Sequence, residues 1–419
     1  MSIVNVDTSA VFPRLFPIPL APLTFIALLA LIACHRDGSS TINPPSFCTG
    51  APAPTTLTIS GYTPNDGVFD PSLTEDACNR IWMSYSAVNN SASGLRLVHA
   101  RIARGNSVGS GWDDMNVGAT PFNVNTEDVV NPVGPLTGTW EHEVSRLVYD
   151  PYTSDPNQRW KILWHRYRFE QTTVGSVGTP RFERGWISLS TAPNATGPWS
   201  AERKLFVGSA YDFDPADKAY NDSFVGLPEY ELDNLFPALS TCLVFTEPGM
   251  LATANGIYIS LKCATGAGGA GDAILMRCDN QFSIGSCSYL GTPLSGTEAA
   301  RYNGTFAGGN AFTGFSATEL VRAGGRDFLL VTPTEGDIYR GCFTFEIDDL
   351  AAATLVRDAA SLLTPKLAVL SASLRGTPGS FNGACGYTQA NTSLGILFSE
   401  LSPTAPHFTI QSSGHQLPP

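Results

Sequence analysis

Residues 242–263, CLVFTEPGMLATANGIYISLKC, contain two short apolar segments, Cys242–Phe245 and Gly256–Leu261, separated by a turn-rich stretch. Short apolar segments of this kind are typical of buried or half-buried β-strands, and the Pro and Gly residues between them favour turns. Glu247 stands where the first segment ends, directly before Pro248 and a glycine. The stretch therefore predicts a β-hairpin that carries a carboxylate at the end of its first strand.

The same unit, a turn-rich stretch followed by strand, turn and strand, recurs along the chain. It is found in the segments 69–103, 140–192, 242–279, 315–347 and 383–414. The 419 residues include 40 Gly and 30 Pro, and only 15% are charged, a composition that suits many short strands. Helical periodicity is confined to Asp348–Leu363, which is interpreted as a helix or, alternatively, as only a connecting segment. The repetition predicts an all-β fold, a five-bladed β-propeller over residues 61–419. A two-sheet β-sandwich with insertions is the alternative.

The N-terminal region has the features of an export signal. The apolar run PLAPLTFIALLALIAC is too short for a membrane-spanning helix and ends in small residues and Cys34. Its last four residues, Leu31 to Cys34, resemble the bacterial lipobox, in which the cysteine is lipidated. We therefore expect a signal peptide over 1–33, and a lipidated Cys34 followed by a flexible linker over 34–60. The alternative is an ordinary signal peptide with a chance cysteine.

The cysteines agree with export. Nine are present, and setting Cys34 aside leaves eight, an even number as expected of an exported disulfide protein. Cys242 and Cys263 are symmetric about one predicted turn, and Cys278 and Cys287 about another. Antiparallel partners at such positions come within bridging distance, so both pairs are candidate disulfides. Disulfides persist in oxidising compartments, which places the protein in the periplasm, in the outer membrane or on the cell surface.

Three of the five units carry an acidic residue at or near the first strand, namely Asp70, Glu143 and Glu247. In a propeller the innermost strands line one central channel, so acids distant in sequence would converge there. Glycosidic cleavage needs such a group, because one carboxylate activates water and a protonated one protonates the leaving oxygen. A third acid raises the pKa of the donor through like-charge repulsion. The trio predicts a glycoside hydrolase.

These motifs resemble those of the family 43 glycoside hydrolases, five-bladed propellers that act on arabinose- and xylose-containing glycans. FDPSLTEDACNRIWMSYS is similar to the first-blade motif that carries the base, which points to Asp70. WEHEVSRLVYDP resembles the second-blade motif that carries the pKa-modulating acid, which points to Glu143. EPGMLATANGIYIS resembles the third-blade motif of the proton donor, which points to Glu247. The resemblance implies hydrolysis with inversion.

Several residues of the stretch WEHEVSRLVYDP, which contains Glu143, allow other interpretations. Glu141 is the alternative to Glu143, because alternate residues of a strand share a face. Trp140 and His142 are candidate substrate-binding residues beside the acids. The family normally has Asp at the position of Glu143 and Pro at that of His142. These departures leave open a non-catalytic surface propeller that binds a glycan or a partner protein.

The remaining features narrow the class of partner. The net charge of −12 makes a nucleic-acid partner improbable. The six histidines show no metal-ligand spacing, so no metal site and no cofactor are predicted. The family resemblance raises an axial calcium ion, which no residue pattern supports. We expect a monomer that binds carbohydrate and meets the membrane only through its lipid anchor.

Overall fold

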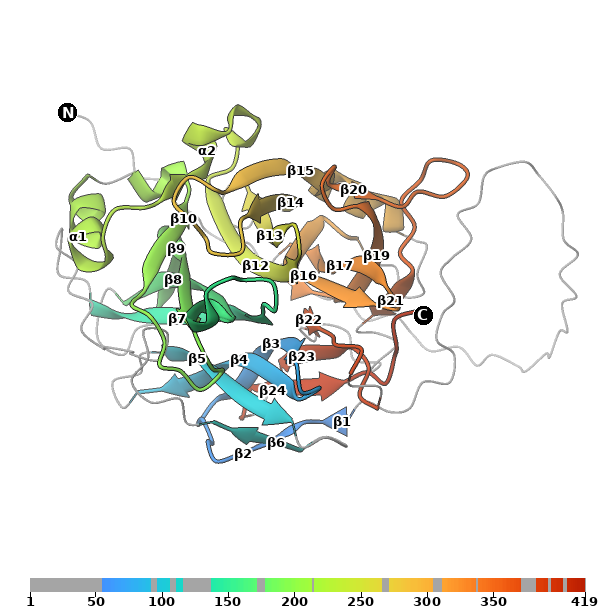
Figure 1. The fold of residues 1–419 in the computed structure, drawn as a ribbon, viewed down its shortest axis with the longest axis horizontal. Helices are drawn as coiled ribbons and strands as arrows, with labels where there is room; N and C mark the ends of the chain where they lie inside the picture. Colours follow the sequence, from blue (N-terminus) through green and yellow to red (C-terminus); the bar gives the residue numbers. More distant parts are fainter. Residues whose placement is uncertain are drawn as a thin grey trace, which may run out of the picture. The chain divides into compact units, whose positions relative to one another are not determined.

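Antiparallel strands make up most of the described chain, as the sequence predicted (Figure 1). The computed structural model describes residues 55–91, 96–105, 111–115, 137–171, 178–212, 215–265, 271–303, 311–336, 338–370, 382–390, 393–401 and 405–418. All belong to Ile42–Pro419, one of two compact units. The predicted signal peptide, Cys34 and the linker as far as residue 54 lie outside these residues.

The strands form five consecutive antiparallel groups. Group one is β3 (Gly67–Glu75), β4 (Ile81–Asn90), β5 (Arg96–Gly105) and β6 (Gly111–Asp114). Group two is β7 (Thr137–Tyr149), β8 (Trp160–Gln171), β9 (Thr179–Ala192) and β10 (Arg203–Val207). Group three is β12 (Val244–Thr253), β13 (Gly256–Ala264), β14 (Gly271–Cys278) and β15 (Ser288–Leu294).

The last two groups are built on the same plan. Group four is β16 (Gly314–Ala323), β17 (Arg326–Glu335) and β19 (Gly341–Asp349), with the short strands β18 (Ile338–Tyr339), β20 (Thr354–Leu355) and β21 (Leu367–Leu370) beside them. Group five is β22 (Asn382–Gly386), β23 (Leu397–Leu401) and β24 (Phe408–Ser412). Single bridges join group three to group four and group five to group one. The described strands therefore divide into three hydrogen-bonded sheets, and none of these closes on itself.

The first strands of the groups contact one another in a closed series. β3 contacts β7, β7 contacts β12, β12 contacts β16, β16 contacts β22, and β22 contacts β3 again. Figure 1 shows these five strands near the middle of the view. The two ends of the described chain meet in group five, where β1 (Thr55–Thr56) pairs with β24. β2 (Thr58–Ser60) pairs with β6 at the edge of group one.

The hydrophobic core consists mainly of five layers, one between each pair of neighbouring groups. Each layer is formed by buried side chains from the strands of two neighbouring groups that face each other. Representative pairs, in order around the series, are Ile102 and Ile162, Leu189 and Ile259, Leu275 and Leu329, Phe328 and Phe398, and Ile410 and Tyr85. The burial of these layers holds the groups in sequence around the first strands.

Both predicted disulfides are confirmed. Cys242 lies two residues before β12 and is joined to Cys263 on β13, with their Cα atoms 5.3 Å apart. Cys278 and Cys287 close a short loop after β14, with a Cα separation of 4.0 Å. A third disulfide, which the sequence did not single out, joins Cys342 on β19 to Cys385 on β22. Cys78 is exposed and has no disulfide partner among the described residues.

The helix predicted over Asp348–Leu363 is wrong. β19 continues to Asp349, a turn follows, and β20 pairs back onto β19. The Asp349 carboxylate accepts the amide N–H groups of Ala351 and Ala352, which holds the chain in the turn. The described α-helices are α1 (Pro215–Val225) and α2 (Leu232–Leu235), between groups two and three. No helix within the described ranges is long and apolar enough to span a membrane.

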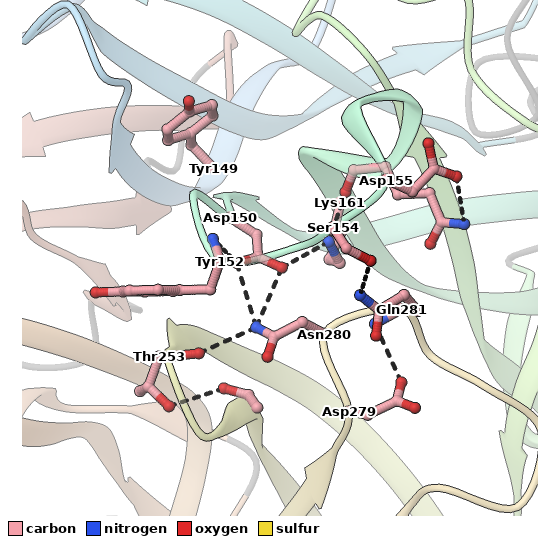
Figure 2. Close-up of polar contacts among 12 residues, drawn as sticks. Tyr149, Asp150, Tyr152, Ser154, Asp155, Lys161, Thr253, Asp279, Asn280 and Gln281 are labelled. Carbon is pink, nitrogen blue, oxygen red and sulfur yellow. Dashed lines mark hydrogen bonds and ion pairs between the residues drawn. The ribbon is translucent and has the colours of Figure 1, made fainter.

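A buried polar network fastens group two to group three (Figure 2). Asp150 follows β7, and its carboxylate accepts the amide of Tyr152, which holds the chain in a turn. The same carboxylate pairs with the Lys161 ammonium at 2.8 Å, and both side chains are fully buried. Asn280, in the loop after β14, donates to the Asp150 carboxylate and to the carbonyl of Thr253. The network therefore fixes the position of β7 relative to β12.

Candidate active site

Each first strand contains one irregularity at the same place. The pairing register shifts between Phe69 and Ser72, between Glu143 and Arg146, between Thr246 and Gly249, between Ser316 and Glu319, and between Gly383 and Gly386. Inside each shift one residue that is not glycine has a positive φ, namely Asp70 (53°), Val144 (52°), Glu247 (55°), Ala317 (46°) and Ala384 (51°). This backbone conformation costs on the order of 1–3 kcal/mol per residue and is typical of functional sites. A β-bulge re-aims the side chains around it, so the five bulges set the direction of the residues where the first strands meet.

The structure brings the three predicted acids together. Asp70 lies in the bulge of β3, Glu247 in the bulge of β12, and Glu143 directly before the bulge residue of β7. Burial is the main reason that the pKa of Asp70 lies well above its usual range, and the charges of Glu247 and then Glu143 raise it further. Asp70 is 3% exposed and Glu143 is 8% exposed, whereas Glu247 is half-buried.

Asp70 is held from two sides. Its amide donates to the Ser399 hydroxyl of β23 at 2.7 Å. The Ser86 hydroxyl of β4 donates to its carboxylate at 3.2 Å, and the same hydroxyl accepts the amide of Val144 at 3.1 Å. Ser86 thus links the bulges of β3 and β7. A hydrogen bond to a carboxylate favours its ionised form, as a general base requires.

Glu143 has a donor at each carboxylate oxygen. The Arg96 guanidinium, at the start of β5, lies 3.1 Å from Oε1. The Tyr167 hydroxyl of β8 donates to Oε2. Arg96 also lies over the rings of Phe69 and Phe408, with its guanidinium carbon 5.9 and 5.6 Å from their centroids. The carboxylate is therefore fixed between groups one and two.

Glu247 is held less completely. The Tyr339 hydroxyl of β18 donates to Oε1 at 3.1 Å, and the Thr318 hydroxyl donates to the main-chain carbonyl at 2.7 Å. Oε2 is buried and has no hydrogen-bond partner among the described residues. Burial raises the pKa of Glu247, Lys262 lowers it, and the charge of Glu143 raises it. A carboxyl group with a raised pKa and one unengaged oxygen fits a proton donor.

Glu141, the alternative to Glu143, serves another purpose. Its carboxylate accepts the Thr139 hydroxyl and the amide of Val98 on β5. It is fully buried, and burial raises its pKa to about 8. One carboxylate oxygen is bound by Thr139 of β7 itself and the other by β5, so Glu141 fastens group two to group one. Glu143 is the better candidate for the catalytic trio.

The predicted substrate contacts of Trp140 and His142 need correction. Trp140 is 1% exposed and packs against Trp186 and Phe224, and His142 is fully buried and stacks on Trp164. Alternation along β7 explains this placement. Glu141 and Glu143 occupy one face of the strand, and Trp140 and His142 occupy the opposite face, which is packed. Neither side chain reaches a surface on which a sugar could lie.

The hollow found among the described residues lies away from the acids. A hollow of about 310 Å³ is lined by residues such as Asn255, Tyr258 and Arg277, and none of the three acids belongs to it. The half-buried Glu247 and Arg96 are the charged groups of the cluster that reach toward solvent. Among the residues that the structure describes, no three His, Cys, Asp or Glu side chains are arranged to hold a metal ion. The axial calcium ion remains an expectation of the resemblance alone.

Comparison with known proteins places the chain beside glycoside hydrolases. No protein-family model matches it, and no curated protein matches it in sequence. Similar solved structures include a thermostable family-43 glycoside hydrolase, with 9% identity, 87% of this chain and 97% of that chain covered, and a TM-score of 0.45. An endo-arabinase from Bacteroides thetaiotaomicron is 10% identical to this chain, and the match covers 85% of this chain and 96% of the endo-arabinase, with a TM-score of 0.42.

A family 117 glycoside hydrolase from the marine bacterium Zobellia galactanivorans is 12% identical to this chain. The match covers 86% of this chain and 89% of that hydrolase, with a TM-score of 0.46. Family 43 structures are thus among the matches, as the sequence motifs predicted. At these values the likeness concerns the course of the backbone.

Proposed function

We propose that this chain is an exported glycoside hydrolase that cleaves arabinose- or xylose-type polysaccharides or oligosaccharides with inversion at the anomeric carbon. Asp70 acts as the general base, Glu247 as the general acid and Glu143 as the modulator of their pKa values. The observation that carries the proposal is the meeting of three carboxyl groups, from three first strands, at bulges that set their direction.

The surroundings of the acids bear on this division of roles. Burial and the charge of Glu143 raise the pKa of both Asp70 and Glu247, so the pair retains a proton at a pH where exposed carboxyls are ionised. Each of the two accepts one hydroxyl hydrogen bond, Asp70 from Ser86 and Glu247 from Tyr339. We place the proton on Glu247 because its Oε2 has no partner among the described residues and is the oxygen available to a leaving group. Water activated by Asp70 attacks the anomeric carbon while Glu247 protonates the leaving oxygen.

We also propose that the fold is a five-bladed propeller and that the protein is exported and lipidated. Five groups, five buried layers and a closed series of first strands support a five-bladed propeller, completed by the pairing of β1 with β24. Three disulfides support an oxidising compartment. We assign residues 1–33 to a signal peptide and Cys34 to lipidation, which would anchor a monomer to a membrane at the bacterial surface or in the periplasm.

Hydrolysis of purified arabinan and xylan tests the proposal. The variants are Asp70→Asn, Glu143→Gln and Glu247→Gln, and the matched control is Glu229→Gln, the same chemical change at a residue paired with Arg203 near β10. We expect the parent and the control to release sugar, and the Asp70 and Glu247 variants to lose about 10²–10⁴ in kcat. NMR spectra recorded early in the reaction should show the inverted anomer.

Two results would count against the proposal. Sugar release by the Asp70 and Glu247 variants at the parental rate would remove those residues from the mechanism. Calorimetric binding of oligosaccharide by the parent, without turnover after long incubation, would favour a non-catalytic glycan-binding propeller.

A further inference from the structure

A second layer of residues crosses the centre of the first strands, just beyond the acids. It consists of the residues at which the register resumes after each bulge, namely Ser72, Arg146, Gly249, Glu319 and Gly386. Two of these are glycines with no room for a side chain. A Cβ on Gly249 would lie 2.7 Å from the Glu319 Cα, and one on Gly386 would lie 2.2 Å from the Pro71 carbonyl oxygen. Arg146 and Glu319 supply the two large side chains of the layer.

Arg146 and Glu319 form an ion pair across this layer. The Arg146 Nε lies 3.2 Å from the Glu319 Oε2, and the two side chains are 0% and 3% exposed. The guanidinium also donates to the carbonyls of Ser145 at 3.1 Å and Thr318 at 3.4 Å. Arg146 belongs to β7 and Glu319 to β16, which are separated by β12 in the closed series of contacts. The pair therefore reaches past the neighbouring strand.

Such a pair calls for an explanation other than stability. Replacing a buried ion pair by neutral side chains of similar volume is often neutral or stabilising, because two charges no longer have to be desolvated. The charge of Arg146 acts on the acids above it, since it lowers the pKa of Asp70 and of Glu247. It thus opposes burial, which raises both pKa values.

The other charged groups around the acids each have a partner or act on one of the acids. Asp70 faces Glu247 and Glu143, which raise its pKa, and it also interacts with Arg96 and with the Tyr339 hydroxyl. Arg96 is paired with Glu143, and Lys262 of β13 acts on Glu247. Arg146 lowers the pKa of both the base and the acid. It is also fully buried, so solvent does not screen it.

We propose that Arg146 is a positioning residue whose buried guanidinium, held in place by Glu319 in the layer next to the acids, opposes the effect of burial and favours the ionised form of the Asp70 carboxyl, the form in which it serves as the base. The proposal rests on the function proposed for the same site. It assigns the ion pair beneath the acids an electrostatic task in the reaction, in addition to filling the centre of the fold.

The test compares the parent with Arg146→Gln/Glu319→Gln and with Arg146→Lys. The double variant removes both charges and keeps amide groups near the Ser145 and Thr318 carbonyls, whereas Arg146→Lys keeps a positive charge. In the double variant we expect the acid limb of the kcat/KM profile to move to higher pH. For each pH unit that the limb moves, kcat/KM at low pH should fall about tenfold. In Arg146→Lys the limb should stay near its parental position.

Thermal unfolding gives a second readout that needs no substrate. Because the pKa of Asp70 is raised in the folded state, its contribution to stability is present at low pH and is lost as the pH rises through that pKa. Comparing each protein with its own Asp70→Asn variant, between about pH 4 and pH 8, isolates this contribution. Removal of Arg146 should extend the loss to higher pH.

Failure of the proposed hydrolase function and failure of the proposed role of Arg146 give different results. A parent that hydrolyses no glycan contradicts the proposed function, whereas the unfolding comparison still tests the charge of Arg146. An active double variant with an unmoved acid limb and an unmoved unfolding difference would overturn the role of Arg146 alone. Should the double variant not fold, Arg146→Met/Glu319→Gln takes its place with the same expected outcomes.

Discussion

Replacement of Glu247 by Gln has a consequence that depends on the substrate's leaving group. The amide preserves the length of the side chain, and the Tyr339 hydroxyl, 3.1 Å from Oε1, still has an oxygen to donate to. The new NH₂ group falls where Oε2 has no partner among the described residues. The change therefore removes the transferable proton and leaves the fold and substrate binding intact.

The expected loss follows from the role of the proton. General acid catalysis contributes about 10²–10⁴ in rate. At 1.36 kcal/mol per factor of ten this corresponds to about 3–5 kcal/mol of transition-state stabilisation. The loss should fall on kcat, with KM little changed, because the proton is transferred only in the transition state.

A pair of substrates makes the assay specific. On an arabino- or xylo-oligosaccharide, whose leaving alcohol needs protonation, Glu247→Gln should lose the full factor. On an aryl glycoside with an acidic phenol as leaving group, the loss should shrink to about tenfold or less, since the phenolate departs without a proton. Asp70→Asn should lose activity on both substrates. Equal losses for Glu247→Gln on the two substrates would refute its assignment as the acid.

Three further predictions concern the surroundings of the acids. Glu143→Gln removes a charge that raises the pKa of both the base and the acid, so both limbs of the kcat/KM profile should move to lower pH, and limbs that stay in place would contradict its role as modulator. Asp150→Asn breaks a fully buried ion pair with Lys161 and should cost about 3–5 kcal/mol in urea unfolding. Asp150→Asn/Lys161→Met should cost less, and an equal cost would argue against the pair. Replacing Cys342 and Cys385 by Ala opens a link between residues 43 apart and should cost about 4 kcal/mol in urea unfolding. Identical midpoints for this variant and the oxidised parent would rule out such a contribution.

The sequence was sufficient to predict the strands and the three acids. Pro and Gly punctuate short apolar segments, and this local pattern marks the strands. The expectation that Glu247 ends its strand is wrong, because β12 continues through Pro248 to Thr253 and Glu247 lies at the bulge inside it. The local disulfides Cys242–Cys263 and Cys278–Cys287 follow from symmetry about a turn. The disulfide from Cys342 to Cys385 links two different groups, so no local pattern predicts it.

The supporting residues of the site carry no signal of their own in the sequence. Arg96, Tyr167 and Tyr339 reach the acids from β5, β8 and β18, which are outer or short strands. Their positions depend on how the groups pack against one another. Arg146 is an arginine in an apolar strand, three residues after Glu143, and only the bulge shows that it belongs to the layer below the acids.

The incorrect predictions have local causes. Trp140 and His142 are adjacent in sequence to the acids, but a strand alternates its side chains, and their face is packed against other aromatic rings. In Asp348–Leu363, the helix-forming alanines are outweighed by aspartates that bind nearby amides. Asp358 accepts the N–H groups of Ala360 and Leu362, which makes a turn rather than a helix.

A crystal structure of Glu247→Gln soaked with an arabino- or xylo-oligosaccharide tests the central claim most directly. The account predicts that the glycosidic oxygen lies within hydrogen-bonding distance of residue 247, at about 2.6–3.2 Å. It also predicts a water between Asp70 and the anomeric carbon, with the carboxyl groups of the base and the acid about 6.5–9.5 Å apart. A sugar bound elsewhere, or an acid trio with no room for a sugar between Asp70 and residue 247, would contradict it.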